Sequence, residues 1–121
     1  MNTVNRARQL QDRTKKFAVR IVNAFARLPK DEAARVIGRQ FLRSGASLAA
    51  NYRAGCRARS TADFISKISM VTEEADETLF WFEILVESEL IRVKTVEALM
   101  LECEELLKIF SASLATAKSN R

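Results

Sequence analysis

The chain has 121 residues, 48% of them hydrophobic and 29% charged, with a formal net charge of +5 at pH 7. These values are typical of a soluble globular protein of one domain, long enough to bury a hydrophobic core. Three glycines and one proline disfavour a many-stranded β fold, no apolar run approaches the roughly 18 residues of a membrane helix, and the polar N-terminus argues against a secretory signal.

Hydrophobic periodicity predicts four helices joined by short connections, at about residues 5–28, 31–58, 61–88 and 95–117. The first helix carries an apolar stripe whose members recur at three-, four- and seven-residue steps: Leu10, Phe17, Ile21, Phe25 and Leu28. Pro29 ends this helix. Basic residues lie on one flank of the stripe, among them Arg13, Lys16 and Arg20.

Asp31 is placed to cap the second helix. The apolar face of this helix holds Ile37, Phe41, Leu48 and Tyr52. At about 100° per residue, five arginines fall within about 80° of arc on the opposite side. We call them the arginine ridge: Arg35, Arg39, Arg43, Arg53 and Arg57. Small or short polar residues on the flank would let a neighbouring helix approach closely: Ser44, Asn51 and Gly55.

Ser60 and Asp63 form an approximate capping box that opens the third helix. Its predicted core face holds Phe64, Ile68, Val71, Ala75, Leu79, Phe82 and Val86. A second apolar group projects away from that face: Met70, Phe80, Trp81 and Ile84. One core cannot use both faces, so we interpret the second group as a subunit interface. The alternative is that these side chains are additional members of the hydrophobic core.

The fourth helix repeats apolar residues cleanly, at Val96, Leu99, Met100, Cys103, Leu107, Phe110 and Leu114. Four helices with short joints predict an all-α fold, an antiparallel up-and-down four-helix bundle that occupies residues 1–121 as one domain. Residues 1–59 hold 14 basic and 3 acidic side chains, whereas residues 60–88 hold 1 basic and 7 acidic ones. A basic half is therefore joined to an acidic helix, which suits head-to-tail ring assembly.

No arrangement typical of catalysis is visible. Histidine is absent, which excludes His-assisted nucleophiles, His-ligated zinc and Glu-x-x-His di-iron sites. Cys56 and Cys103 lack CxxC spacing, so we expect reduced, partly buried thiols of a cytoplasmic protein. The acidic cluster of the third helix (Glu73, Glu74, Asp76 and Glu77) favours a solvated or ion-paired face over a metal site. We expect a non-enzymatic protein without metal or cofactor.

Three stretches, DRTKKFAVRIVNAFARLP, RSGASLAANYRAGCRARS and ADFISKISMVTEEADETLFWFEIL, resemble the four helix bundle protein family, also called 23S ribosomal RNA intervening-sequence proteins. The resemblance covers nearly the whole chain. It implies an antiparallel bundle and a homopentamer shaped like a tapered barrel. Some relatives are encoded inside intervening sequences of 23S ribosomal RNA genes. Others are accessory proteins of diversity-generating retroelements, which bind nucleic acid and a reverse transcriptase.

The chain also departs from its relatives at one point. Some members carry Ala-Glu after the Asn-aromatic pair, where this chain has Arg53 and Ala54. Glu77 is the acidic residue that the family motif singles out, and we expect it to pair with an arginine of the second helix or to hydrogen-bond near Asn51.

Two functional interpretations remain open. In the first, the arginine ridge, aided by Arg13, Lys16 and Arg20, contacts the phosphate backbone of RNA or DNA without reading bases. The ridge itself carries no aromatic ring, which disfavours base stacking. In the second, the arginines pair with acids of the same or a neighbouring subunit, and the protein is an interaction scaffold. The acids in question are Glu73, Asp76, Glu77 and Glu83. The predicted oligomer interface comprises Met70, Phe80, Trp81 and Ile84 with Glu73 and Glu77.

Overall fold

The computed structural model describes residues 3–121, and its regular secondary structure there is entirely helical. The elements are α1 (Thr3–Ala26), α2 (Glu32–Cys56), α3 (Thr61–Glu87) and α4 (Val93–Ser119). The four predicted helices are confirmed, and each observed boundary lies within two residues of its predicted position. In residues 3–121, no helix has the length and apolar character needed to cross a membrane.

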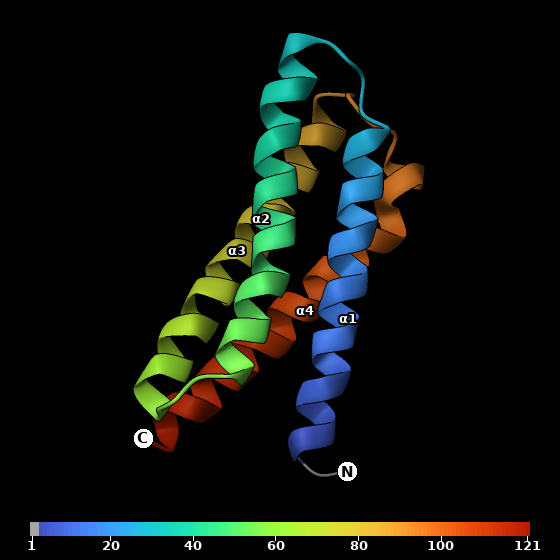
Figure 1. The fold of residues 1–121 in the computed structure, drawn as a ribbon. Coiled ribbons are helices and arrows are strands. Elements are labelled where there is room, and N and C mark those ends of the chain that lie inside the picture. The colour runs from blue at the N-terminus through green and yellow to red at the C-terminus, as the bar shows by residue number, and fades with distance from the viewer. Residues whose placement is uncertain (1–2) are drawn as a thin grey trace.

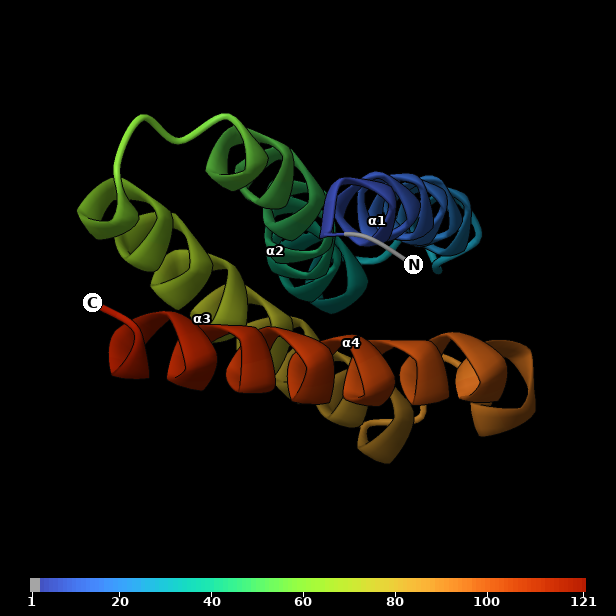
Figure 2. The same cartoon turned by 90° about the horizontal axis from the view of Figure 1, so that it is seen from below.

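The four helices pack as a bundle in which α2 and α3 make the most extensive contact. The N-terminus, the C-terminus and the α2–α3 connection lie at one end of the bundle, and the other two connections lie at the opposite end (Figure 1). Contact between α1 and α4 is slight by comparison. Figure 2 shows the two termini well apart, with α2 beside α1 on one side of the molecule. One flank of α2 therefore faces the basic helix α1, and the other faces the acidic helix α3.

Local sequence sets the helix ends. Asp31 caps α2 by accepting a hydrogen bond from the backbone N–H of Ala34 at 2.9 Å. Ser60 caps α3 in the same way, accepting from the N–H of Asp63 at 3.0 Å. At the C-terminus of α3, Glu89 takes a left-handed conformation with φ of 61°. Both predicted N-caps are confirmed.

The core lies between the four apolar faces. It contains an edge-to-face pair between α2 and α3, Phe41 and Phe82, whose ring centroids are 4.8 Å apart. The buried members of the core are Phe17, Ile21, Leu28, Phe41, Leu48, Tyr52, Ile68, Val71, Ala75, Phe82, Leu85, Val96, Leu99, Cys103, Leu106 and Phe110. The predicted faces account for all but two of these, Leu85 and Leu106. Those two are buried because α3 and α4 each pack against the bundle over a wider arc than one stripe.

Two glycines let α1 approach α2 closely. A Cβ atom at Gly45 would lie 2.8 Å from the side chain of Ile21. One at Gly38 would lie 3.2 Å from that of Phe25 and 2.8 Å from that of Leu28, just after the end of α1. No side chain larger than hydrogen fits at either position without movement of a buried neighbour. Gly55, on the opposite flank of α2, faces Lys67 and Ile68 of α3.

Candidate nucleic-acid interface

The arginine ridge lies on the outer surface of α2. All five members are exposed: Arg35, Arg39, Arg43, Arg53 and Arg57. Helical periodicity places them opposite the buried side chains of Phe41 and Leu48. The ridge is therefore available to solvent in the subunit.

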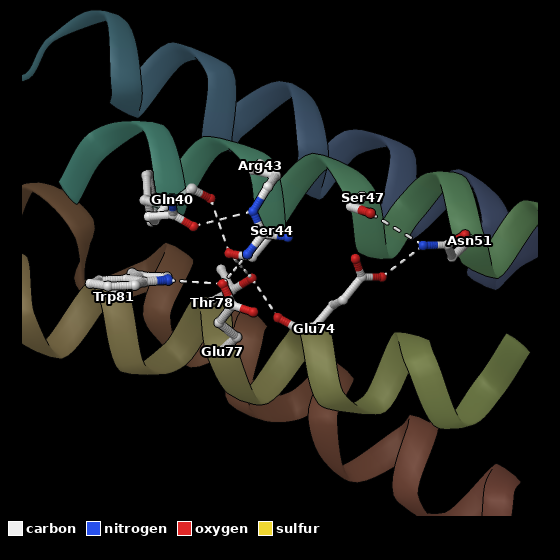
Figure 3. A network of polar contacts seen from close by, with 10 residues as sticks. Gln40, Arg43, Ser44, Ser47, Asn51, Glu74, Glu77, Thr78 and Trp81 are labelled. Atoms are coloured by element: carbon white, nitrogen blue, oxygen red, sulfur yellow. Dashed lines mark hydrogen bonds and ion pairs between the residues drawn. The ribbon is translucent and has the colours of Figure 1, made fainter. Parts of the chain in front are cut away.

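One member of the ridge is already neutralised. Arg43 forms an ion pair with Glu77 of α3, and its Nε donates a hydrogen bond to the side-chain oxygen of Gln40 at 3.2 Å. The indole Nε1 of Trp81 donates to the same Glu77 carboxylate at 3.1 Å. Figure 3 shows these groups converging between α2 and α3. The expected pairing of Glu77 with an arginine of the second helix is confirmed, and Asn51 is not its partner.

The polar contact between α2 and α3 continues along both helices (Figure 3). Asn51 donates to Glu74 at 2.8 Å and to Ser47 at 3.2 Å. The hydroxyl groups of Ser44 and Thr78 are hydrogen-bonded at 2.9 Å and are fully buried. Each hydroxyl also contacts a carbonyl of its own helix, Ser44 that of Phe41 and Thr78 that of Glu74. The bond between the two hydroxyl groups favours one register of the helices, because sliding would break it.

The rest of the ridge is different. Within residues 3–121, no ion pair involves the other four arginines: Arg35, Arg39, Arg53 and Arg57. The four form two pairs along α2, Arg35 with Arg39 and Arg53 with Arg57. A gap separates the pairs, since Arg39 and Arg53 are 14 positions apart. The gap is occupied on the outer face by Ala46 and Ala50 and by the neutralised Arg43. The free positive charge of α2 thus forms two clusters.

The three basic residues expected from the first helix divide as well. Lys16 and Arg20 are exposed, but Arg13 is half-buried and tied to α4. Its Nε and Nη2 atoms donate to the two carboxylate oxygens of Glu102, each at 2.7 Å. This two-pronged hydrogen bond lowers the pKa of the Glu102 carboxyl below its usual range, against the opposing effect of burial. Arg13 is therefore placed to join α1 to α4.

The predicted interface residues share the outer face of α3. We call this the α3 face: Met70, Glu73, Glu77, Phe80, Trp81 and Ile84. Phe80 is 49% exposed and Met70 is 41% exposed, whereas Trp81 is half-buried and packs against the core. The Phe80 and Trp81 rings meet edge to face with centroids 5.0 Å apart. Trp81 therefore belongs partly to the core, whereas Met70 and, despite its contact with Trp81, Phe80 leave much of their apolar surface exposed in the subunit.

Other predicted groups fall in separate places. Cys56 is half-buried and Cys103 is buried, both as free thiols. Burial raises the pKa of Cys103 to about 12, so this thiol is unreactive at neutral pH. Among the described residues, no group of three or more acidic or cysteine side chains is placed to hold a metal ion.

Sequence reasoning missed two contributors. Glu102 belongs to a fourth-helix segment whose acids alternate with core positions, so nothing in its spacing indicated Arg13, 89 residues away, as its partner. Thr78 is outside the predicted core face of α3, yet it is fully buried. The only local signal of this burial is that Thr78 is a β-branched hydroxyl residue one helical turn after Glu74. Its hydroxyl donates to the Glu74 carbonyl at 2.7 Å.

Comparison with known proteins places the chain in a family. Residues 7–112 match the family model described as 23S rRNA-intervening sequence protein. The crystal structure of a protein of unknown function from the S23 ribosomal protein family of Bacteroides thetaiotaomicron is similar, with a TM-score of 0.83 and 35% sequence identity. The match covers 90% of this chain and 97% of that one. No curated protein matches the chain. The chain therefore belongs to the 23S rRNA-intervening sequence protein family.

Proposed function

We propose that this protein is a non-enzymatic, homo-oligomeric helical bundle that binds the phosphate backbone of RNA or DNA through the exposed arginines of α2. It would act as an accessory to a nucleic-acid enzyme or a ribonucleoprotein. The family name refers to an intervening sequence of 23S rRNA, which is compatible with such a role.

The observation that supports this proposal most directly is the state of the ridge. Four exposed arginines carry no ion pair within residues 3–121. A guanidinium presents a planar fork of donors that matches phosphate oxygens. Neutralising phosphates releases condensed counterions from the nucleic acid, and affinity obtained in this way falls steeply with salt.

The α3 face supports the oligomeric part of the proposal. Phe80 and Met70 expose apolar surface beside Glu73 and the Arg43–Glu77 pair. A second copy of the chain would cover these side chains, and a closed ring of antiparallel up-and-down bundles, such as a pentamer, would repeat the arginine ridge in every subunit. Weak phosphate contacts would then add through multivalency.

The test is a salt series on a labelled RNA hairpin and a labelled DNA duplex, with native mass measured by light scattering. We expect a multimeric mass and a linear fall of log affinity with log salt. The double variant Arg39→Gln/Arg53→Gln should reduce the slope by about two. Lys94→Gln/Lys108→Gln is the matched control, since both lysines are exposed on α4. Binding that does not change with salt, or equal losses in both double variants, would contradict the proposal.

A second candidate is a protein-interaction scaffold whose free arginines meet acids of a neighbouring subunit. The exposed acid Glu73 on the α3 face favours it. Charge reversal at Arg39 and Arg53 separates the two. The scaffold requires the native mass to fall to that of the monomer, whereas backbone binding requires the mass to persist while nucleic-acid affinity disappears. Arg43 is unsuitable for this purpose because its partner lies in the same subunit.

A further inference from the structure

Two grooves follow the contact between α1 and α2, and in each of them arginines of α2 meet a lysine from outside α2. The groove nearer the N-terminus of α1, which we call the lower groove, has a volume of about 280 Å³. It is lined by three cations: Lys15 of α1, and Arg53 and Arg57 of α2. Its floor is made of small side chains, Ala18, Ala49 and Ala50. Asp12 is the one acid along this groove, so the cations exceed the acids.

The upper groove, with a volume of about 210 Å³, lies near the α1–α2 connection. It too is walled by three cations: Lys30 of the connection, and Arg35 and Arg39 of α2. No acid lines it, and its apolar side includes Phe25, Leu28 and Ala34. Each groove therefore holds two of the four arginines that make no ion pair within residues 3–121, together with one lysine that the ridge does not contain.

The spacing of the grooves matches a polymer better than a small anion. Arg39 and Arg53 are 14 residues apart, which is about 21 Å along α2. Phosphate groups repeat along every nucleic-acid backbone, so one backbone can place two phosphates this far apart, whereas a single small anion cannot occupy both grooves. One continuous backbone can reach both grooves at once.

We propose that one strand of a nucleic-acid duplex crosses the α1–α2 face and places phosphate groups in both grooves, with Lys15 and Lys30 completing the two sites. This inference rests on the proposed function and specifies its geometry. A duplex is favoured over a single strand because Phe25 is the one aromatic ring of α1 and α2 that is not buried, and it is half-buried, so a row of unpaired bases has no platform for stacking there. The alanine floor lets a phosphate approach the lower cations without a bulky side chain in its path.

The first experiment removes the lysines one at a time. Lys15→Gln and Lys30→Gln are compared with Lys108→Gln, an exposed lysine of α4 outside both grooves. The probe is a hairpin with a stem of about 12 base pairs. All three variants lose one positive charge, so an effect of net charge alone would lower the affinity of all three for this hairpin equally. Each groove lysine should instead weaken binding several-fold more than Lys108→Gln and reduce the salt slope by about one.

The second experiment blocks the lower groove without changing charge. Ala50→Leu adds bulk to its exposed floor, and Ala112→Leu adds the same bulk to an exposed site of α4. We expect the first variant to bind the hairpin several-fold more weakly and the second to bind as the unmodified protein does. Thermal unfolding of both variants confirms that the fold is kept.

The outcomes separate the two proposals. Suppose the Arg39→Gln/Arg53→Gln variant loses binding, while the Lys15, Lys30 and Ala50 variants behave like their controls. The groove inference is then wrong and the proposed function stands. If the unmodified protein binds neither the hairpin nor duplex DNA at low salt, both are wrong.

Discussion

The two flanks of α2 differ in what they do with positive charge. Toward α3, Arg43 is held by Glu77, and the contact is continued by the Ser44–Thr78 and Asn51–Glu74 hydrogen bonds. Toward α1, the contact consists of apolar side chains that pack against Gly45 and Gly38. The arginines on that flank make no ion pair in the described part of the chain.

The difference follows from what each neighbouring helix offers. α3 carries seven acids, six of them from Glu73 onward, whereas Asp12 is the only acid of α1. An exposed arginine finds an intramolecular partner only where the adjacent helix supplies a carboxylate within about 4 Å. Arg13 obeys the same rule, because it faces α4 and meets Glu102 there. Charge that remains free on α1 and α2 is thus a consequence of how acids are distributed among the helices.

The glycine contact should give the largest change in stability. Gly45→Ala places a Cβ against the fully buried Ile21. Overpacking of this kind costs about 1–3 kcal/mol, and the higher helix propensity of alanine recovers up to about 1. We expect a net loss of about 1–2 kcal/mol in the free energy of unfolding, measured by urea denaturation.

Gly55→Ala is the control for that variant, because its new Cβ would lie 3.2 Å from Lys67 Cβ and 3.6 Å from Ile68. We expect a change near zero, since the gain in helix propensity offsets the tighter contact. Equal losses at the two glycines would show that the α1–α2 contact is no tighter than the α2–α3 contact.

The buried hydroxyl pair tests the α2–α3 flank. Thr78→Val keeps the side-chain shape, removes the hydrogen bond to Ser44 and should lower the free energy of unfolding by about 1 kcal/mol. Adding Ser44→Ala should cost little more, because both members of the pair are then gone. Strictly additive losses in urea denaturation would mean that the two hydroxyl groups do not act as a pair.

The Arg13–Glu102 pair should make stability depend on pH. The pKa of Glu102 is lowered from its ordinary value of 4.5, so the pair stabilises the fold above that pH and loses its effect as the pH falls through the lower folded value. Because Arg13 is partly exposed, we expect Glu102→Gln to cost only about 0.5–1 kcal/mol at pH 7. The difference between variant and unmodified protein should shrink below pH 4.5 in thermal unfolding measured across pH.

Glu77→Gln should have the smallest effect on stability and the most informative effect on binding. Both partners of the Arg43–Glu77 pair are substantially exposed, so its loss should cost less than about 0.5 kcal/mol. The freed Arg43 would add one cation to the ridge and steepen the salt slope by about one. Glu83→Gln, an exposed acid of α3 that makes no ion pair within residues 3–121, is the control. Identical behaviour of the two variants would show that pairing does not restrain Arg43.

Much of this protein follows from local sequence. Helix positions, the caps at Asp31 and Ser60, most of the core and the alignment of five arginines on one side of α2 all depend on spacing within about ten residues. Those features are determined by backbone geometry, which is the same in any helix. Leu85 and Leu106 were not predicted in the core. They are buried because neighbouring helices cover a wide arc of α3 and α4.

Tertiary structure decided which arginine of the ridge is neutralised and which four make no ion pair within residues 3–121. Arg43 and Glu77 are 34 residues apart, and Arg13 and Glu102 are 89 apart. Whether such groups meet depends on the rotation of each helix about its axis and on the closeness of approach that the glycines of α2 allow. The sequence thus determined which charges lie on a common face, and packing decided which of them remain free to bind.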